Sequence, residues 1–205
     1  MASNPMNSPS SDNGGSFDVQ GSRAIRNYSS REMIARVMWR LAQPAFFLSP
    51  RILYRWRNFL LRMFGASVGS GVRIHQTSHI RYPWLFSIDD NSAIGENAIV
   101  YNLGQVTIGK RATISQNAHL CAGTHDYNDT KFPLVRSTIK VGDDCWVCAD
   151  AFVGPNVILG DHSIAAARAV VVKDIPANEI FGGNPAKKII SRNIATTSGR
   201  TNGNS

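Results

Sequence analysis

The sequence predicts an all-β solenoid, a stack of triangular coils built from parallel strands. Three observations support this fold class. Every sixth residue of the stretch 141–171 is aliphatic, and the residue after each is mostly small. A period of six fits neither the 3.6-residue turn of a helix nor the alternation of a single strand. It does fit a solenoid in which each hexad forms one flat side and every sixth residue points to the axis. These axial residues are Val141, Val147, Val153, Leu159, Ala165 and Val171.

The axial positions continue toward the N-terminus and group in threes, which gives about five coils of 18 residues within residues 67–176. The register shifts by two residues near Tyr82 and again between Asn102 and Thr107. We expect a bulge at a corner of the triangle at each shift, where it costs least. The pattern breaks over residues 121–138, which we expect to form an inserted loop. The further axial residues are Val68, Ile74, Ile80, Ile88, Ile94, Val100, Ile108, Ile114 and Leu120.

Composition divides the rest of the chain into segments around the coils. Residues 1–28 and 192–205 are mostly small and polar. We expect both to be disordered tails, because they cannot bury enough apolar surface to offset the entropy of ordering. Residues 29–66 are a basic, amphipathic segment that we expect to be helical. Residues 177–191 are expected to close the solenoid with a short helix.

Two amphipathic helices are expected within the segment 29–66, with Ser30 as a cap at the start and interruptions at Pro44 and Pro50. Such helices could cap the end of the solenoid or pack on a neighbouring subunit. Arginines beside Trp, Phe and Leu are also typical of helices that lie on a membrane, so membrane-surface association through residues 31–64 is the other interpretation. The apolar stripes are Met33, Ile34, Val37, Met38 and Leu41, then Ile52, Leu53, Trp56, Phe59, Leu60, Met63 and Phe64.

Charge and composition argue against several function classes. The formal net charge is +8, yet residues 68–190 contain eleven basic and eleven acidic residues, so the excess belongs to the segment before the coils. Without a basic stripe over the folded body, no nucleic-acid partner is expected. No apolar run approaches the roughly 18 residues of a membrane-spanning helix. Three cysteines, an odd number, favour a reducing compartment. We expect a cytoplasmic protein, or one held peripherally at the inner face of the membrane.

Four stretches carry a resemblance to a known family. They are YNLGQVTIG at 101–109, ISQNAHLCAGTHDYND at 114–129, IKVGDDCWVCADAFVGPNVILGD at 139–161 and VVKDIPANEIFGGNPAKKI at 171–189. Together they resemble the hexapeptide-repeat acyltransferases, which are left-handed parallel β-helices. Within that family they are most similar to the colanic acid biosynthesis acetyltransferases, relatives of the maltose, galactoside and nodulation-factor O-acetyltransferases. The resemblance covers about residues 51–190.

The resemblance implies the left hand of the coil and an O-acetyltransferase activity. Acetyl-CoA would be the co-substrate, no metal would be needed, and the acceptor would be a hydroxyl of a sugar or nascent polysaccharide. It also implies a homotrimer with its active sites between subunits. The hydroxyl would attack the thioester directly in a ternary complex, because no cysteine or serine has a convincing base partner for an acyl-enzyme.

The interruption at 121–138 is the first place to seek catalysis, because a loop that leaves a regular solenoid spoils stacking and usually has another use. Transfer to a hydroxyl needs a base near neutral pKa, for which histidine is the usual choice. The resemblance assigns this role to His125, against a structural role in the loop. Asp126 or a backbone carbonyl could orient the imidazole, and Tyr127 could support the loop.

Trp146 precedes an axial position and should therefore lie on an outer face, where a large aromatic often marks a ligand or subunit contact. By resemblance it lines the groove for the pantetheine arm of the coenzyme between two subunits. Ala149 matches a backbone N–H donor near the thioester, a candidate oxyanion contact. Ala167 matches another pantetheine contact on the next coil.

Four further positions carry two interpretations each. Coenzyme A is strongly anionic, so Lys173, Lys187 and Lys188 near the end of the coils are candidate contacts; the alternative is that they simply solvate the surface. Asn102 matches a family position that touches the acceptor sugar. Its alternative is a corner residue, because asparagine tolerates left-handed backbone geometry.

Two rival functions remain open on the same fold. A zinc-dependent hydratase of carbonic-anhydrase type needs three convergent imidazoles. His119 and His125 are six residues apart and could share a face, but His75 lies two coils away, so a third ligand is missing unless His79 or a neighbouring subunit supplies it. The second rival is a non-catalytic scaffold that binds sugar or membrane. Cys145 and Cys148 form a single CxxC pair, which by itself is weak evidence for redox or zinc chemistry.

Overall fold

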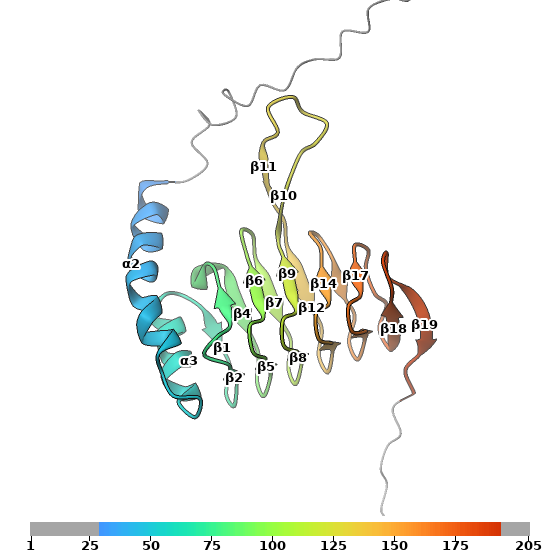
Figure 1. Cartoon of the computed structure of the whole chain (residues 1–205), viewed down its shortest axis with the longest axis horizontal. Helices are drawn as coiled ribbons and strands as arrows, with labels where there is room; N and C mark the ends of the chain where they lie inside the picture. The colour runs from blue at the N-terminus through green and yellow to red at the C-terminus, as the bar shows by residue number, and fades with distance from the viewer. Residues whose placement is uncertain (1–28, 194–205) are drawn as a thin grey trace, which may run out of the picture.

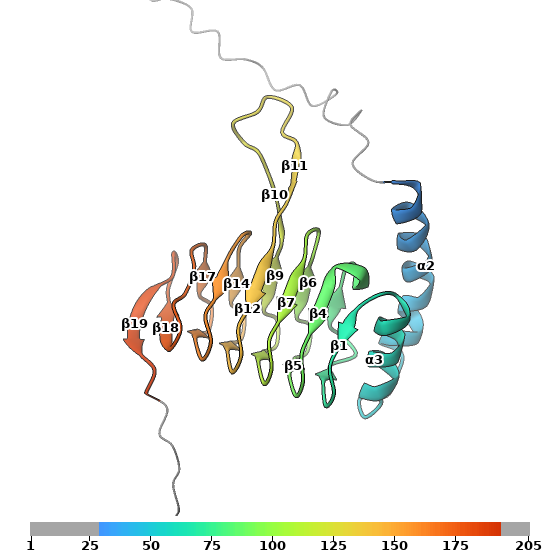
Figure 2. The same cartoon turned by 180° about the vertical axis from the view of Figure 1, so that it is seen from behind.

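A computed structural model describes residues 29–193. The stretch 1–28, predicted to be disordered, lies outside the described residues, as do residues 194–205 of the tail predicted at 192–205. Within the described part the chain forms a prism of three parallel sheets, closed at one end by two helices (Figures 1 and 2). No helix among residues 29–193 is long and apolar enough to cross a membrane.

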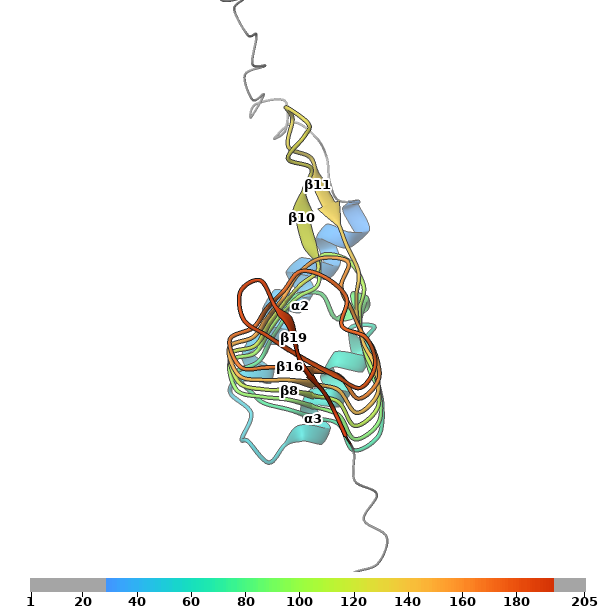
Figure 3. The same cartoon turned by 90° about the vertical axis from the view of Figure 1, so that its right-hand side faces the viewer.

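The prism has three flat faces, which we call faces A, B and C (Figure 3). Successive strands along the chain visit A, B and C in turn, so neighbours within a face come from successive coils. Face A contains β1 (Ser67–Val68), β4 (Phe86–Ile88), β7 (Val106–Ile108), β12 (Ile139–Val141) and β15 (Ile158–Leu159). Face B contains β2 (Arg73–Ile74), β5 (Ala93–Ile94), β8 (Thr113–Ile114), β13 (Trp146–Val147), β16 (Ile164–Ala165), β18 (Glu179–Gly182) and β19 (Lys187–Ser191). Face C contains β3 (His79–Ile80), β6 (Ile99–Tyr101), β9 (His119–Cys121), β14 (Phe152–Val153) and β17 (Val170–Val171).

All fifteen predicted axial side chains are buried, the most exposed being Val68 at 8%. The prediction of the solenoid and of its register is therefore confirmed. The expected number of about five coils is slightly low. A sixth turn begins where Ile175 bridges to Leu159 and β18 pairs in parallel with β16.

The corners of the triangle require an unusual backbone conformation. Ten corner residues have positive φ, and seven of them are Asn or Asp, which tolerate the left-handed region better than other side chains. This explains why a short polar residue recurs between the strands. The ten are Asn91, Asn97, Arg111, Asn117, Asp144, Asp150, Asn156, His162, Arg168 and Asn178.

Corner residues also pair between coils. The guanidinium of Arg111 donates to both carboxylate oxygens of Asp144, at 2.7 and 2.6 Å. His162 lies on the opposite side, with its Nδ1 at 3.6 Å from Asp144. The hydrogen bond from Arg111 is the main cause that lowers the pKa of Asp144 below its ordinary value. This cluster ties three successive coils together at one corner.

The N-terminal helices are α2 (Ser30–Phe47) and α3 (Tyr54–Met63), and a short 3₁₀ turn, η1 (Pro83–Leu85), marks the first register shift. The cap is Ser29, one residue before the predicted Ser30; its hydroxyl accepts from the N–H of Glu32 at 3.2 Å. The expected interruption at Pro44 is wrong, because Pro44 lies within the last turn of α2.

The two helices close the prism mostly with residues outside the predicted stripes, Leu60 being the buried exception. Trp39 and Phe46 of α2 are buried, and the indole N–H of Trp39 donates to the carbonyl of Ile80 at 3.1 Å. Leu60 and Leu61 of α3 are also buried. Most of the predicted stripe residues instead remain exposed, among them every member of the stripe in α2. The end of the solenoid is therefore capped, while the amphipathic stripes face away from it.

The short helix expected within residues 177–191 is wrong. The segment forms β18 and β19, an antiparallel pair in which Ile180 faces Ile190. β18 adopts an extended conformation because it continues the ladder of face B above β16. The predicted tail also begins too early, since Arg192 donates to the carbonyls of Asp144 and His162 at 2.9 and 2.8 Å.

Acid should remove the stability that depends on Asp144. Its pKa is lower in the folded chain than in the unfolded one, so its contribution is complete above the ordinary aspartate value of about 3.9 and is lost as the pH falls through the folded value. We expect Asp144→Asn, which keeps the corner geometry, to lower the melting temperature at neutral pH. That deficit should shrink in acid. Thermal melts across pH measure both effects, with exposed Asp89→Asn as control. A deficit independent of pH would contradict this assignment.

Candidate functional site

The interruption at residues 121–138 forms a hairpin that leaves the prism. Its strands are β10 (Gly123–His125) and β11 (Leu134–Arg136), which pair antiparallel. Because β9 belongs to face C and β12 to face A, the hairpin leaves at the corner between these faces. Figures 1 and 2 show it projecting well beyond the coils. The hairpin therefore places the candidate base, His125, outside the coils and within reach of a neighbouring molecule.

His125 lies at the outer end of β10 and is exposed. Its Nδ1 is 2.7 Å from the carbonyl oxygen of Phe132, and the two rings stack with centroids 4.9 Å apart. A carbonyl can only accept, so the proton of the neutral imidazole resides on Nδ1. The lone pair of Nε2 is then available to an incoming hydroxyl. This is the tautomer and the orientation that a general base requires.

The carbonyl of Phe132 is thus the group that orients His125, one of the two possibilities left open by the sequence. The other, Asp126, accepts from the N–H of Asn128 at 3.0 Å and shapes the hairpin turn instead. Tyr127 is 75% exposed at the end of the hairpin. Phe132 is a site residue that sequence reasoning missed, because its contact with His125 depends on the pairing of β10 and β11.

Trp146 lies on the outside of face B and is 46% exposed, as its position before Val147 predicted. Its indole N–H donates to the hydroxyl of Ser115 on the preceding coil at 2.8 Å.

Ala149 and Ala167 occupy equivalent corner turns after β13 and β16. They stack on successive coils, where the carbonyl of Ala149 accepts from Arg168 at 3.0 Å. Among the described residues neither alanine N–H donates a hydrogen bond, so both remain available to a ligand.

A cavity of about 510 Å³ opens on the same face B, on the N-terminal side of Trp146. Ser115, the hydrogen-bond partner of Trp146, forms part of its wall. Two guanidinium groups, from Arg51 and Arg73, also line it together with Glu96. The cavity is large enough for a small ligand, and its wall combines these polar groups with apolar surface from Ala93, Ile94 and Ile114.

His125 and Trp146 do not meet within one chain. The hairpin leaves the corner between faces C and A, whereas Trp146 lies on face B, opposite that corner (Figure 3). The predicted base and the predicted coenzyme groove therefore belong to different sides of the prism. If both serve one reaction, two chains must contribute to each site.

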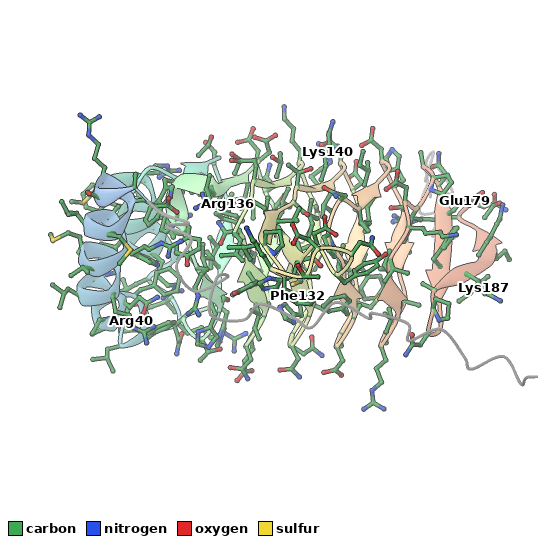
Figure 4. The ribbon with its side chains drawn as sticks, turned by 90° about the horizontal axis from the view of Figure 1, so that it is seen from above. Arg40, Phe132, Arg136, Lys140, Glu179 and Lys187 are labelled. Carbon is green, nitrogen blue, oxygen red and sulfur yellow. The ribbon has the colours of Figure 1, made fainter. Side chains whose placement is uncertain are left out.

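The predicted basic contacts lie near the C-terminal end of the prism. Lys173 follows β17 and is exposed, and Lys187 and Lys188 lie on β19 (Figure 4). Lys188 already forms an ion pair with Glu179, with 2.5 Å between Nζ and Oε1. Of the three predicted lysines, Lys173 and Lys187 have no ion pair among the described residues and remain candidates for an anionic ligand.

Asn102 is fully buried at the corner where the register shifts. Its side-chain oxygen accepts from the N–H groups of Arg81 and Tyr82 at 3.1 and 3.0 Å. Its amide nitrogen donates to the carbonyls of Tyr82 and Leu85 at 2.6 and 3.1 Å. These four hydrogen bonds brace the corner of the coil. They agree with the structural role that was the alternative to sugar binding for this residue. The acceptor contact expected from the resemblance stays a prediction.

The two cysteines of the CxxC pair and His119 have structural surroundings. Cys145 and Cys148 are buried, and burial raises the pKa of both thiols, which disfavours a thiolate nucleophile. His119 packs edge-on against Phe152, and burial lowers its pKa. Across residues 29–193 no group of three or more His, Cys, Asp or Glu side chains converges as metal ligands would. The three imidazoles that the hydratase needs are thus not brought together within the described part of one chain.

Comparison with known proteins places the chain in a family. It is 39% identical over 176 residues to the colanic acid biosynthesis acetyltransferase WcaF of Escherichia coli K12, which covers 85% of this chain and 97% of that protein. It is 26% identical to the galactoside O-acetyltransferase of the same organism, over 65% of this chain and 67% of that protein. No family model matches the chain.

Solved structures show the same fold. A maltose O-acetyltransferase from Clostridium difficile 630 superimposes with a TM-score of 0.74 at 22% identity, over 81% of this chain and 90% of that one. A galactoside acetyltransferase in complex with coenzyme A gives a TM-score of 0.74 at 21% identity, over 85% of this chain and 89% of that one. These neighbours are left-handed β-helices, and the predicted fold class is confirmed.

The chain belongs to the hexapeptide-repeat acetyltransferases, enzymes that use an acyl-CoA donor. One relative within that family, covered over 97% of its length, is named the colanic acid biosynthesis acetyltransferase WcaF.

Removing the side chain of Asn102 should destabilise the fold. Asn102→Ala leaves buried backbone groups of one corner without their partner, at a cost of about 1–3 kcal/mol for each group left unsatisfied. Urea unfolding measures the loss, and Gln105→Ala, which removes a single bond to Ser87 at 3.2 Å, is the matched control. Unchanged stability combined with a raised KM for the acceptor would contradict the role as a brace.

Proposed function

We propose that this protein transfers an acetyl group from acetyl-CoA to a hydroxyl of a sugar or nascent polysaccharide, with His125 as the general base. The orientation of His125 is the observation that carries the proposal. Its Nδ1 is held by the carbonyl of Phe132, which leaves the lone pair of Nε2 free on an exposed residue. The names of the relatives, which include galactoside and maltose O-acetyltransferases, support a sugar as acceptor.

The chemistry needs no covalent intermediate on the protein. As the acceptor oxygen attacks the thioester carbonyl, Nε2 of His125 accepts the hydroxyl proton. The tetrahedral intermediate then collapses with breakage of the carbon–sulfur bond, and the imidazolium returns its proton to the departing sulfur. The acetyl ester and the free thiol of coenzyme A are the products. Direct transfer agrees with the burial of Cys145 and Cys148, which removes two potential nucleophiles from contact with substrate.

Face B supplies the groove for the coenzyme in this proposal. Trp146 provides an exposed apolar surface for the pantetheine arm, and the free N–H of Ala149 is placed to stabilise the oxyanion. Ala167 offers a second backbone contact one coil further. Lys173 and Lys187 lie toward the end where the phosphates of the coenzyme would emerge.

A homotrimer reconciles the positions of His125 and Trp146. These residues lie on opposite sides of one prism, and a ring of three chains lets the hairpin of one subunit reach face B of the next. Each of the three active sites would then combine two chains. The cavity beside Ser115 opens on the same face as Trp146 and is our candidate for the acceptor subsite. The cytoplasmic location expected from the cysteines stays a prediction.

Loss of the imidazole should remove most of the activity without unfolding the protein. His125 is exposed, so His125→Ala should leave the melting temperature unchanged while kcat falls by about 10²–10⁴, the usual contribution of a general base. Acetyl transfer is measured by release of the coenzyme A thiol with a series of sugar acceptors. Asp126→Ala is the matched control on the same hairpin and should cost less than about tenfold, because Asp126 does not touch the ring.

Partial recovery of the His125→Ala rate by added imidazole would support loss of a base over loss of structure. Full activity of His125→Ala would overturn the catalytic role and favour the scaffold. Stoichiometric zinc together with hydration of carbon dioxide would favour the hydratase.

The composite site predicts complementation between two inactive variants. His125→Ala lacks the base and Trp146→Ala lacks the groove wall, so each homotrimer should have little activity. In a mixed trimer one junction always pairs an intact His125 with an intact Trp146. Co-expressed, doubly tagged and purified mixed trimers should therefore recover about one third of the wild-type rate per trimer. Mixed trimers as inactive as the parents would place both residues in one chain and contradict the shared site.

A further inference from the structure

The outer surface of the N-terminal helices carries the largest group of exposed apolar side chains in the described part of the chain. Eleven of the twenty large apolar residues that are exposed among residues 29–193 lie between Met33 and Met63. We call this surface the cap face. Its residues are Met33, Ile34, Val37, Met38, Leu41, Leu48, Ile52, Leu53, Trp56, Phe59 and Met63.

The cap face points away from the prism. At about 100° per residue, the stripe centred on Val37 in α2 is nearly opposite buried Trp39 and Phe46. In α3, Phe59 and its neighbours are likewise opposite the buried residues of that helix. The indole N–H of Trp56 in α3 donates to the carbonyl of Ala45 in α2 at 3.0 Å. The two stripes therefore adjoin and form one continuous surface across the end of the solenoid.

The charges around the cap face are almost all positive. Residues 29–66 contain a single acidic residue, Glu32, and seven arginines, of which Arg57 is buried and Arg62 donates to the carbonyl of Val68 in the first coil. That carboxylate already pairs with Arg36 and Arg136, at 3.1 and 3.2 Å. Arg31 and Arg40 fall on the two edges of the stripe in α2 by the same helical arithmetic, and Figure 4 shows Arg40 at the outer end of the molecule. Exposed Arg55 flanks the stripe in α3.

We infer that the cap face docks on the surface of an anionic lipid bilayer. Apolar and aromatic side chains at the centre of a plane, with guanidinium groups at its rim, match the acyl boundary and the phosphate headgroups of a membrane surface. A second copy of the chain fits less well. Two cap faces in contact would bring the rim arginines of one copy against those of the other, with no free carboxylate between them.

Docking of this face fixes the orientation of the catalytic hairpin. α2 lies across the end of the prism, so the axis of the coils stands away from the bilayer (Figures 1 and 3). The β10–β11 hairpin leaves the third coil and extends in the same direction as α2, parallel to the membrane (Figures 1 and 2). The hairpin would lie about 20 Å above the lipid, which is the sum of two coil spacings of about 4.8 Å and one helix diameter of about 10 Å. An acceptor glycan on a lipid anchor would be presented at that height, a consequence that rests on the proposed function.

Vesicle flotation of the full chain tests the inference. The probes are vesicles of neutral phosphatidylcholine and vesicles with about 30% phosphatidylglycerol. The double variant Leu41→Glu with Phe59→Glu places charge at two exposed positions of the cap face, and its fold is checked by circular dichroism. The matched control is Ile189→Glu with Ile190→Glu, two exposed apolar residues at the opposite end. Arg31→Ala with Arg55→Ala tests the rim.

We expect the wild-type protein and the Ile189/Ile190 control to float with anionic vesicles, and the Leu41/Phe59 variant to bind at least about tenfold more weakly. The Arg31/Arg55 variant should lose most of its preference for anionic over neutral vesicles. Absence of wild-type binding, or equal binding by the Leu41/Phe59 variant, would overturn the inference. The inference would also fail if sedimentation showed an oligomer larger than the trimer that only the Leu41/Phe59 variant dissociates. In that case the cap face would bind a second copy of the chain rather than lipid. Acetyl transfer to a soluble sugar is measured separately, so its failure would not affect the vesicle result.

Discussion

The hydrogen-bonded stacking of one coil on the next is the constraint on which the rest of the structure depends. Each coil places its axial side chain directly above that of the coil before, as Ile114 lies beside Ile94 and Val147 on face B. A slip of one residue would turn every axial side chain outward, so the register tolerates no error along a strand. Extra residues can enter only at corners. This is why the one long insertion among the described coils leaves at the corner between faces C and A.

The same constraint explains how the histidine proposed as the base can be both oriented by hydrogen bonding and remote from the core. His125 takes no part in the ladder between coils; its orientation comes from the pairing of β10 with β11 and from the carbonyl of Phe132. The base of the hairpin is tied to α2 through the ion pair of Arg136 with Glu32, and Figure 4 shows Arg136 on the side toward the helix. The helical cap and the candidate base are thus parts of one connected structure.

The open end of a solenoid also has to be covered, because its first coil offers unpaired backbone groups. Arg57 of α3 binds one of these groups, the carbonyl of Ile74. It is completely buried, stacks on the ring of Tyr54, and donates to the carbonyls of Ile74, Pro50 and Arg51 and to the hydroxyl of Ser49. Burial lowers its pKa, yet the four acceptors satisfy its donors without a carboxylate. Because Arg57 and the buried aromatics of α2 supply the cap, the amphipathic stripes are free to face outward.

The sequence by itself determined the solenoid, its register, the corner positions and the outward placement of Trp146, because a six-residue period fixes the direction of each side chain locally. It also isolated His125 in the interruption. Only the tertiary structure decided what that period does not encode. The partner of His125 is a backbone carbonyl seven residues away, the polar atoms of Asn102 are used by another coil, and the closing segment is strand because the ladder of face B continues into it. The tertiary structure also decided which side of α2 faces the core. Two sides of that helix carry large apolar residues, and the contact of Trp39 with Ile80 selected the side with Trp39.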